Sequence, residues 1–131
     1  MPVIGTGIDL VYVPGFAEQW RQPGTRFEQL FTSRERADCR GGVDDQGIAS
    51  LAARWAAKEA FIKAWSESLW GSGPAMPHEI HHLIETIRDA WGRPRLCLGA
   101  DIRAHLAGGE VFVSLSHDGD YALANVLLSR D

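Results

Sequence analysis

The stretch Leu51–Ser66, LAARWAAKEAFIKAWS, decides the fold that we predict for this chain. It is rich in alanine, leucine, lysine and glutamate, and no glycine or proline follows it before Gly71, so a long helix is predicted. Side chains three and four residues apart share a helix face, and one such face is an apolar stripe of Leu51, Trp55, Ile62, Trp65 and Leu69. We expect this stripe to pack against the core.

A second row of the same helix combines small side chains with two charges: Ala52, Ala56, Glu59 and Lys63. The alanines are predicted to leave open space beside a carboxylate and an ammonium set one turn apart. Such a notch would suit a divalent cation held by Glu59 and a phosphate held by Lys63. The alternative is an ordinary Glu–Lys pair on a solvated helix face, which stabilises a helix by about 0.2–0.5 kcal/mol.

Composition sets broad limits on the class of protein. The 131 residues suit one domain, residues 1–131, with a substantial core, and 45% hydrophobic and 23% charged residues are ordinary for a globular protein. The net charge of −4 argues against a partner such as nucleic acid or an anionic membrane. Cys39 and Cys97 are too few for a disulfide framework. With no secretory signal pattern and no membrane-spanning apolar run, we expect a cytoplasmic protein.

The N-terminal segment Pro2–Val13 has the composition of a strand. With a period of two, one of its faces carries Gly5, Gly7, Asp9 and Val11. A carboxylate in an apolar strand needs a partner or a metal, and the two glycines would let a bulky ligand approach Asp9. The alternative is a salt bridge from Asp9 to an arginine, or a helix cap.

Shorter elements surround the long helix. Phe16–Gln22 is a helix candidate, the Thr32–Glu35 pair predicts a capping box that starts another helix, and Gly41–Gly47 is expected to be a flexible connection. The rest of the chain predicts strands at 84–87 and 95–98, a helix at 100–107, and a hairpin over 110–128 that turns at Asp118-Gly119 and returns as a central strand. The predicted fold is α+β, a small and mostly antiparallel sheet packed against one long helix and several short ones.

His78-Glu79-Ile80-His81-His82 fits the H-E-x-x-H pattern of zinc proteases. In that pattern two histidines on one helix face bind zinc and the glutamate acts as general base. The context disagrees, because residues 83–87 alternate like a strand, and the extended pattern would need a glycine and a histidine where Glu85 and Arg88 stand. A zinc hydrolase using His78 and His82 remains an alternative.

Five motifs occur in order along the chain: Gly7-Ile8-Asp9, Phe31-Thr32-x-x-Glu35, Trp55-Ala-Ala-Lys-Glu-Ala60 with Lys63, Gly92-Arg-Pro94, and Val113-Ser-Leu-Ser-His117. Together they resemble the holo-acyl-carrier-protein synthases, the short, single-lobed branch of the 4'-phosphopantetheinyl transferases, and most of all the actinobacterial members. The resemblance covers essentially the whole chain and implies the fold of that family.

The resemblance implies an enzyme that transfers 4'-phosphopantetheine from coenzyme A to a serine of apo-acyl carrier protein. The reaction releases adenosine 3',5'-bisphosphate and supports fatty acid biosynthesis. Mg²⁺ is then held by Asp9 and Glu59, and Lys63 contacts the pyrophosphate. Since the serine hydroxyl must lose a proton, Glu59 is the candidate for accepting it, directly or through a metal-bound water. Catalysis is thus expected to rest on Glu59 and Lys63.

The same resemblance places coenzyme A against Lys63, with Gly92 and Pro94 bordering the adenine and His117 near the 3'-phosphate. Family members are usually homotrimers with active sites between subunits, and acyl carrier protein docks on the first helix. Many relatives carry basic residues where this chain has Asp44-Asp45-Gln46, so the 3'-phosphate must depend on His117, Arg93 or another arginine. A non-catalytic module that binds coenzyme A or a carrier protein is a further alternative, which the intact Asp9, Glu59 and Lys63 set argues against.

Overall fold

The computed structural model describes residues 2–76 and 79–131. In chain order its elements are β1 Val3–Tyr12, α1 Val13–Trp20, η1 Phe27–Leu30, α2 Ser33–Asp38, η2 Arg40–Gly42, α3 Asp45–Ser68, η3 His81–Leu83, β2 Ile84–Arg88, β3 Pro94–Leu98, α4 Ala100–Leu106, β4 Glu110–Asp118 and β5 Tyr121–Ser129, where η marks a 3-10 helix. The α+β prediction is confirmed.

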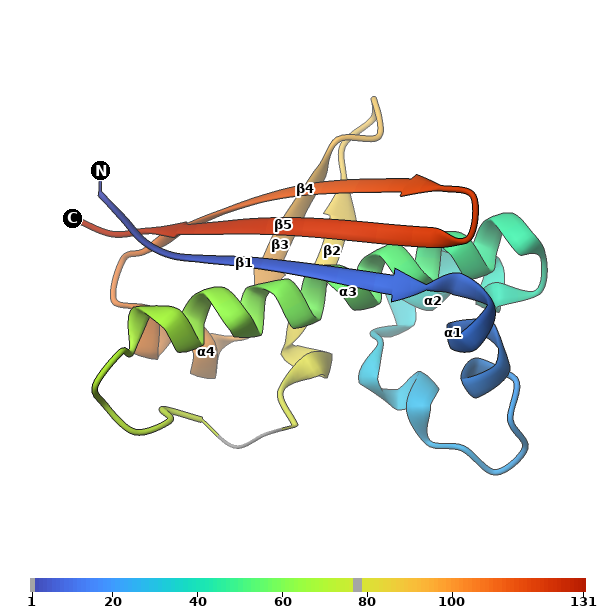
Figure 1. Ribbon diagram of the computed structural model, residues 1–131, viewed down its shortest axis with the longest axis horizontal. Coiled ribbons are helices and arrows are strands. Elements are labelled where there is room, and N and C mark those ends of the chain that lie inside the picture. The colour runs from blue at the N-terminus through green and yellow to red at the C-terminus, as the bar shows by residue number, and fades with distance from the viewer. Residues whose placement is uncertain (1, 77–78) are drawn as a thin grey trace.

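The strands form two antiparallel sheets, one of three strands in the order β1-β5-β4 and one made by the β2–β3 hairpin. β5 is the central strand, as its apolar sequence predicts. Asp118 pairs with Tyr121, so the β4–β5 turn is Gly119-Asp120, one residue later than predicted. Figure 1 shows α3 running beneath the three-stranded sheet, with the β2–β3 hairpin projecting away from it.

Helix α3 begins earlier than predicted. The Asp44 side chain accepts a hydrogen bond from the Gly47 amide at 2.7 Å and so caps the helix, which starts at Asp45. The connection expected over residues 41–47 is therefore largely helical. In contrast, the capping box of α2 is confirmed, since the Thr32 side chain accepts from the Glu35 amide and the Glu35 carboxylate from the Thr32 amide.

Two glycines of β1 set the spacing between the sheet and α3. A Cβ atom added to Gly5 would come within 2.0 Å of the Ala64 carbonyl oxygen, and one added to Gly7 within 1.9 Å of the Ala60 carbonyl oxygen. The prediction that these glycines make room for a ligand is therefore wrong. Their missing side chains let the helix backbone lie directly against the strand.

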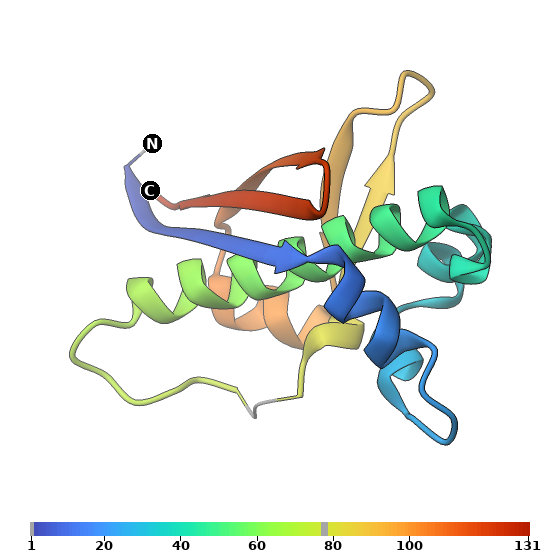
Figure 2. The ribbon, with the colours of Figure 1, turned by 45° about the vertical axis from the view of Figure 1, so that its right-hand side comes forward.

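Helix α3 is buried on more than one side, since the sheet covers one face while α1, η1, α4 and the β2–β3 hairpin cover others (Figure 2). Ala52 and Ala56 are fully buried, so the open notch expected beside them does not exist. The predicted apolar stripe is only partly a core face: Leu51 and Trp65 are buried, while Trp55, Ile62 and Leu69 are half-buried. The close approach of helix and sheet explains both corrections, because it buries the alanine side as well.

Candidate functional site

The first pair of site residues joins β1 to α3. Asp9 lies on the β1 face that carries Gly5 and Gly7, and its side chain is 17% exposed. The Lys63 ammonium lies 3.0 Å from Asp9 Oδ1 and donates to the Ile8 carbonyl oxygen at 2.9 Å. Burial raises the pKa of Asp9, the Lys63 hydrogen bond and charge lower it, and the charge of Glu59 raises it further. The two carboxylates therefore share one electrostatic environment.

Glu59 stands one turn before Lys63, at the edge of the same cluster. Its carboxylate is 33% exposed, and Oε1 lies 3.5 Å from Nε2 of His81. Contact with the His81 ring lowers the pKa of Glu59, partial burial opposes this, and the charge of Lys63 reinforces it. Glu59 thus keeps its negative charge beside a second carboxylate.

This donor set fits a magnesium ion. The two carboxylates repel each other, which a divalent cation between them would relieve. Within residues 2–76 and 79–131 no group of three or more histidine, cysteine or acidic side chains could hold a metal. A hard cation bound by one or two carboxylates completes its shell with water and substrate phosphate oxygens, as Mg²⁺ does.

The residues expected at the adenine end lie on the β2–β3 hairpin, whose tip projects away from α3 and β1 (Figure 1). Asp89 organises the tip by accepting from the amides of Trp91 and Arg93 and from Arg93 Nε. Gly92 supports the turn with a φ of 83°. A hollow of about 510 Å³ lies there, lined by Ile87, Arg88, Asp89, Arg93, Pro94 and Arg95.

His117 lies near the exposed end of β4. Its backbone pairs with Ala122 and that of Leu115 with Ala124, which in turn faces Asp9 on β1. Side chains two residues apart point to the same side of a strand, so His117 is on the sheet face that carries Asp9. Within one chain the structure unites Asp9, Glu59 and Lys63 and leaves the hairpin residues apart from them.

Known proteins resemble this chain both in sequence and in fold. Residues 5–126 match the family described as the 4'-phosphopantetheinyl transferase superfamily. The chain is 50% identical over 128 residues to the holo-[acyl-carrier-protein] synthase of Mycobacterium ulcerans, covering 98% of each chain.

The chain belongs to the 4'-phosphopantetheinyl transferase superfamily. Within it, the chain is an enzyme of the holo-acyl-carrier-protein synthase branch. Among solved structures, the Chronobacterium ammoniagenes ACPS–CoA complex superimposes with a TM-score of 0.89 at 42% identity, covering 96% of each chain. The Mycobacterium tuberculosis acyl carrier protein synthase superimposes with a TM-score of 0.82 at 43% identity, covering 99% of this chain and 100% of that one.

Membership in this transferase superfamily disfavours both alternatives. His78 lies outside the described residues, Glu79 is not in a helix, and His82 is exposed in the short η3 turn. The helix face that a zinc protease needs is therefore missing from the described part of the motif. The non-catalytic module is equally disfavoured, because the curated relatives are named as synthases.

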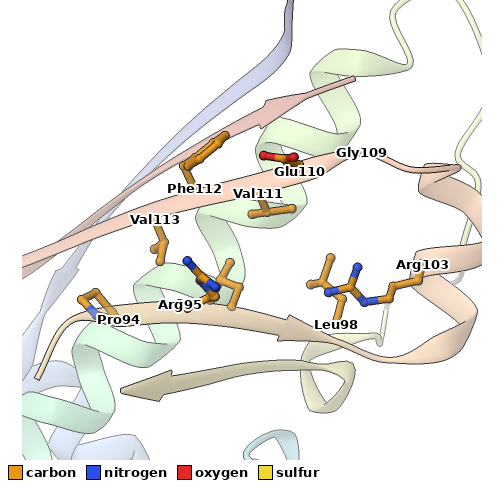
Figure 3. A pocket seen from close by; sticks show the side chains of 10 residues that line it. Pro94, Arg95, Leu98, Arg103, Gly109, Glu110, Val111, Phe112 and Val113 are labelled. Atoms are coloured by element: carbon orange, nitrogen blue, oxygen red, sulfur yellow. The ribbon is translucent and has the colours of Figure 1, made fainter. Parts of the chain in front are cut away.

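A second hollow of the transferase, about 430 Å³, lies between β3 and β4 (Figure 3). Figure 3 shows Arg95 and Arg103 between these strands, opposite Val111 and Val113. Arg95 lines both this cleft and the hollow at the hairpin tip. A basic surface therefore continues from the hairpin along β3 towards α4.

Sequence reasoning missed two residues that lie beside the Asp9–Glu59–Lys63 cluster. Lys58 is fully buried and donates to Glu35 Oε1 at 2.7 Å and to the carbonyl oxygens of His81 and Ile84. Burial lowers the pKa of Lys58, and the charge of Glu35 opposes that shift. In the sequence, the signal for Lys58 is a charged residue within the alanine-rich segment Trp55–Ala60. His81 has no such signal, because it stands out only as part of the His78–His82 segment that fits the zinc pattern.

Proposed function

We propose that this enzyme transfers 4'-phosphopantetheine from coenzyme A to a serine of apo-acyl carrier protein and releases adenosine 3',5'-bisphosphate. The observation that carries the proposal is the meeting of Asp9 from β1 with Glu59 and Lys63 from α3 in one cluster. The coenzyme A complex of the Chronobacterium ammoniagenes relative supports the choice of donor.

Each residue of the cluster has a role that suits its chemistry. Asp9 and Glu59 would hold Mg²⁺, which when bound supplies positive charge for the developing charge on the phosphate oxygens. Lys63 stabilises the diphosphate through its ammonium, and its exposed side chain can leave Asp9 to do so. Glu59 accepts the proton of the attacking serine hydroxyl, since its lowered pKa keeps it ionised at neutral pH.

The adenine end of coenzyme A is assigned to Gly92, Arg93, Pro94 and His117. Arg93 is paired with Asp89. Arg88 and Arg95 line the same hollow as Arg93, so they are further cationic groups that could bind the 3'-phosphate. Guanidinium groups bind phosphate oxygens in pairs of hydrogen bonds. This basic hollow supports the expectation that another arginine replaces the basic residues absent at positions 44–46.

A homotrimer with active sites between subunits would unite the two halves of this site. The hairpin of one chain projects away from its own Asp9–Glu59–Lys63 cluster (Figure 1). In an oligomer this hairpin would lie over the same cluster of a neighbouring subunit. The outer face of the three-stranded sheet is apolar and exposed, as an interface between subunits requires. On it lie Ile8, Leu10, Tyr12, Phe112 and Tyr121.

Other parts of the proposal concern the setting of the reaction. Acyl carrier protein would dock on α1, and the chain would work as one transferase domain, residues 1–131, in the cytoplasm and in fatty acid biosynthesis. No helix of the described ranges is long and apolar enough to cross a membrane.

Mass spectrometry of apo-acyl carrier protein incubated with coenzyme A, Mg²⁺ and the enzyme tests the proposal. We expect a mass increase of one phosphopantetheine, lost when a chelator removes the metal and restored by Mg²⁺. Glu59→Gln should abolish transfer, whereas Glu67→Gln, two turns further along α3, should not. Absence of any mass increase with every apo-carrier tried, or a near-normal rate for Glu59→Gln, would overturn it.

A further inference from the structure

The His81 ring is enclosed between two side chains of α3. It stacks on Trp55 with ring centroids 4.7 Å apart and planes inclined by 17°, and its Nε2 lies 3.5 Å from Glu59 Oε1. Both ring nitrogens are buried from solvent, and neither forms a hydrogen bond within the described parts of the chain. At that distance the Glu59 carboxylate is a polar neighbour of this imidazole.

The backbone of His81 is also held in place, by a hydrogen bond from α3. Its carbonyl oxygen accepts a hydrogen bond from Lys58 Nζ at 2.8 Å, and the same ammonium lies 2.7 Å from Glu35 Oε1. Lys58 immediately precedes Glu59, and Trp55 lies one turn before it. Two α3 residues beside Glu59 thus place the His81 ring against the Glu59 carboxylate.

We propose that His81 is a positioning residue that holds the Glu59 carboxylate in its working orientation. The inference rests on the proposed function, because it gives Glu59 its role in metal binding and proton transfer. A carboxylate that is one-third exposed has several accessible rotamers, and a ring nitrogen beside Oε1 favours one of them. Since the ring nitrogens are buried, His81 acts through Glu59 and not on the substrate.

Substitutions separate this role from simple packing on Trp55. His81→Phe keeps an aromatic ring for the stack and removes the nitrogens, whereas His81→Gln restores a polar side-chain group. Removing a partner that orients a metal ligand lowers activity or metal affinity by about 10- to 100-fold. We expect that fall in kcat for His81→Phe with little change in melting temperature, partial recovery in His81→Gln, and wild-type behaviour for His82→Phe, an exposed neighbour.

Direct metal binding gives a readout besides turnover. Titration of Mn²⁺ in the presence of coenzyme A, followed by electron paramagnetic resonance, should show weaker binding to His81→Phe than to the wild type. If His81→Phe matches the wild type in both kcat and Mn²⁺ affinity, the ring serves only for packing and the proposal is overturned.

A measurement on the intact ring covers the case in which the variants fail to fold. The ¹⁵N resonances of the His81 ring should shift in Glu59→Gln and stay unchanged in Glu67→Gln, and no shift in Glu59→Gln would overturn the inference. The two hypotheses fail differently. A wild-type enzyme that transfers nothing refutes the proposed function, whereas a transferring wild type equalled by His81→Phe refutes only the positioning role.

Discussion

Lys63 joins α3 to β1 through Asp9: its Nζ lies 3.0 Å from Asp9 Oδ1 and 2.9 Å from the Ile8 carbonyl oxygen. The lysine therefore neutralises one of the two carboxylates in the absence of substrate. When a diphosphate and a cation enter, the same ammonium has phosphate oxygens as alternative partners. Lys63 is therefore the group that changes partner on binding.

Replacing Lys63 by methionine should impair transfer without unfolding the protein. Loss of a group that stabilises transition-state charge reduces kcat by about 100- to 1000-fold. The Lys63 side chain is 55% exposed and that of Asp9 17%, so the pair is only partly a surface pair, and its loss should lower the melting temperature modestly. Steady-state kinetics with apo-acyl carrier protein, together with thermal unfolding, check both expectations. A Lys63→Met enzyme that retained most of its rate would contradict the assigned role.

Gly7→Ala should destabilise the protein, because the new methyl group would meet the Ala60 carbonyl oxygen at 1.9 Å. Inserting atoms into a packed interior costs about 1–3 kcal/mol, and more where backbone must move. Gly73→Ala is the matched control, since a Cβ atom added to Gly73 would meet nothing within 4 Å. Urea unfolding of the two variants measures the difference. Equal stabilities would show that β1 and α3 do not approach each other this closely.

Local patterns were sufficient to predict most elements of this fold. The alternation of β4, the run of helix formers in α3 and the capping box at Thr32 each depend on residues close together in sequence. The motifs that resemble the transferase family predict Asp9, Glu59 and Lys63 as site residues. Their meeting depends on how β1 lies on α3, which no local pattern encodes.

The failures share one physical cause, the close packing of α3 between several elements. Gly5 and Ala52 suggested space for a ligand, because a sequence shows which side chains are small and not what fills the gap. Lys58 was missed because its partner Glu35 is 23 residues away and because buried lysines are rare. The His81 ring lies against Glu59 because the η3 turn packs beside α3, and only the tertiary fold determines the position of that turn.

Lys58→Met should strongly destabilise the fold. It leaves the Glu35 carboxylate buried without its cation, and breaking such a pair costs about 3–5 kcal/mol. The added substitution Glu35→Gln removes the orphaned charge and keeps one oxygen for one of the two amides, of Thr32 and Thr86, that the carboxylate oxygens of Glu35 accept from, so it should recover part of the loss. Denaturant unfolding of the single and double variants tests this. A Lys58→Met protein as stable as the wild type would disprove the structural role.

Asp9→Asn should abolish transfer and yet stabilise the metal-free protein at neutral pH. The pKa of Asp9 is raised in the folded state, chiefly by burial, so its contribution to stability is present at low pH and is lost as pH rises through that raised value. Asparagine carries no charge to bury, so the advantage of the variant should appear at neutral pH. It should vanish below the ordinary aspartate value of 3.8, where both side chains are neutral. Melting temperatures of the two proteins, measured with a chelator across pH, show whether the variant is more or less stable than the wild type. A variant less stable than the wild type at pH 7 would contradict the prediction.

Leu10→Arg tests whether the outer sheet face joins subunits. Leu10 is 61% exposed in the isolated chain, so an arginine fits the monomer but would bury an unpaired charge in an interface. We expect a folded monomer by light scattering, with transfer lost because no neighbour supplies the hairpin residues. Val43→Arg is the control, since Val43 is 84% exposed and lies outside the sheet. A monomeric Leu10→Arg enzyme with full activity would refute a shared site, and an unchanged assembly would place the interface elsewhere.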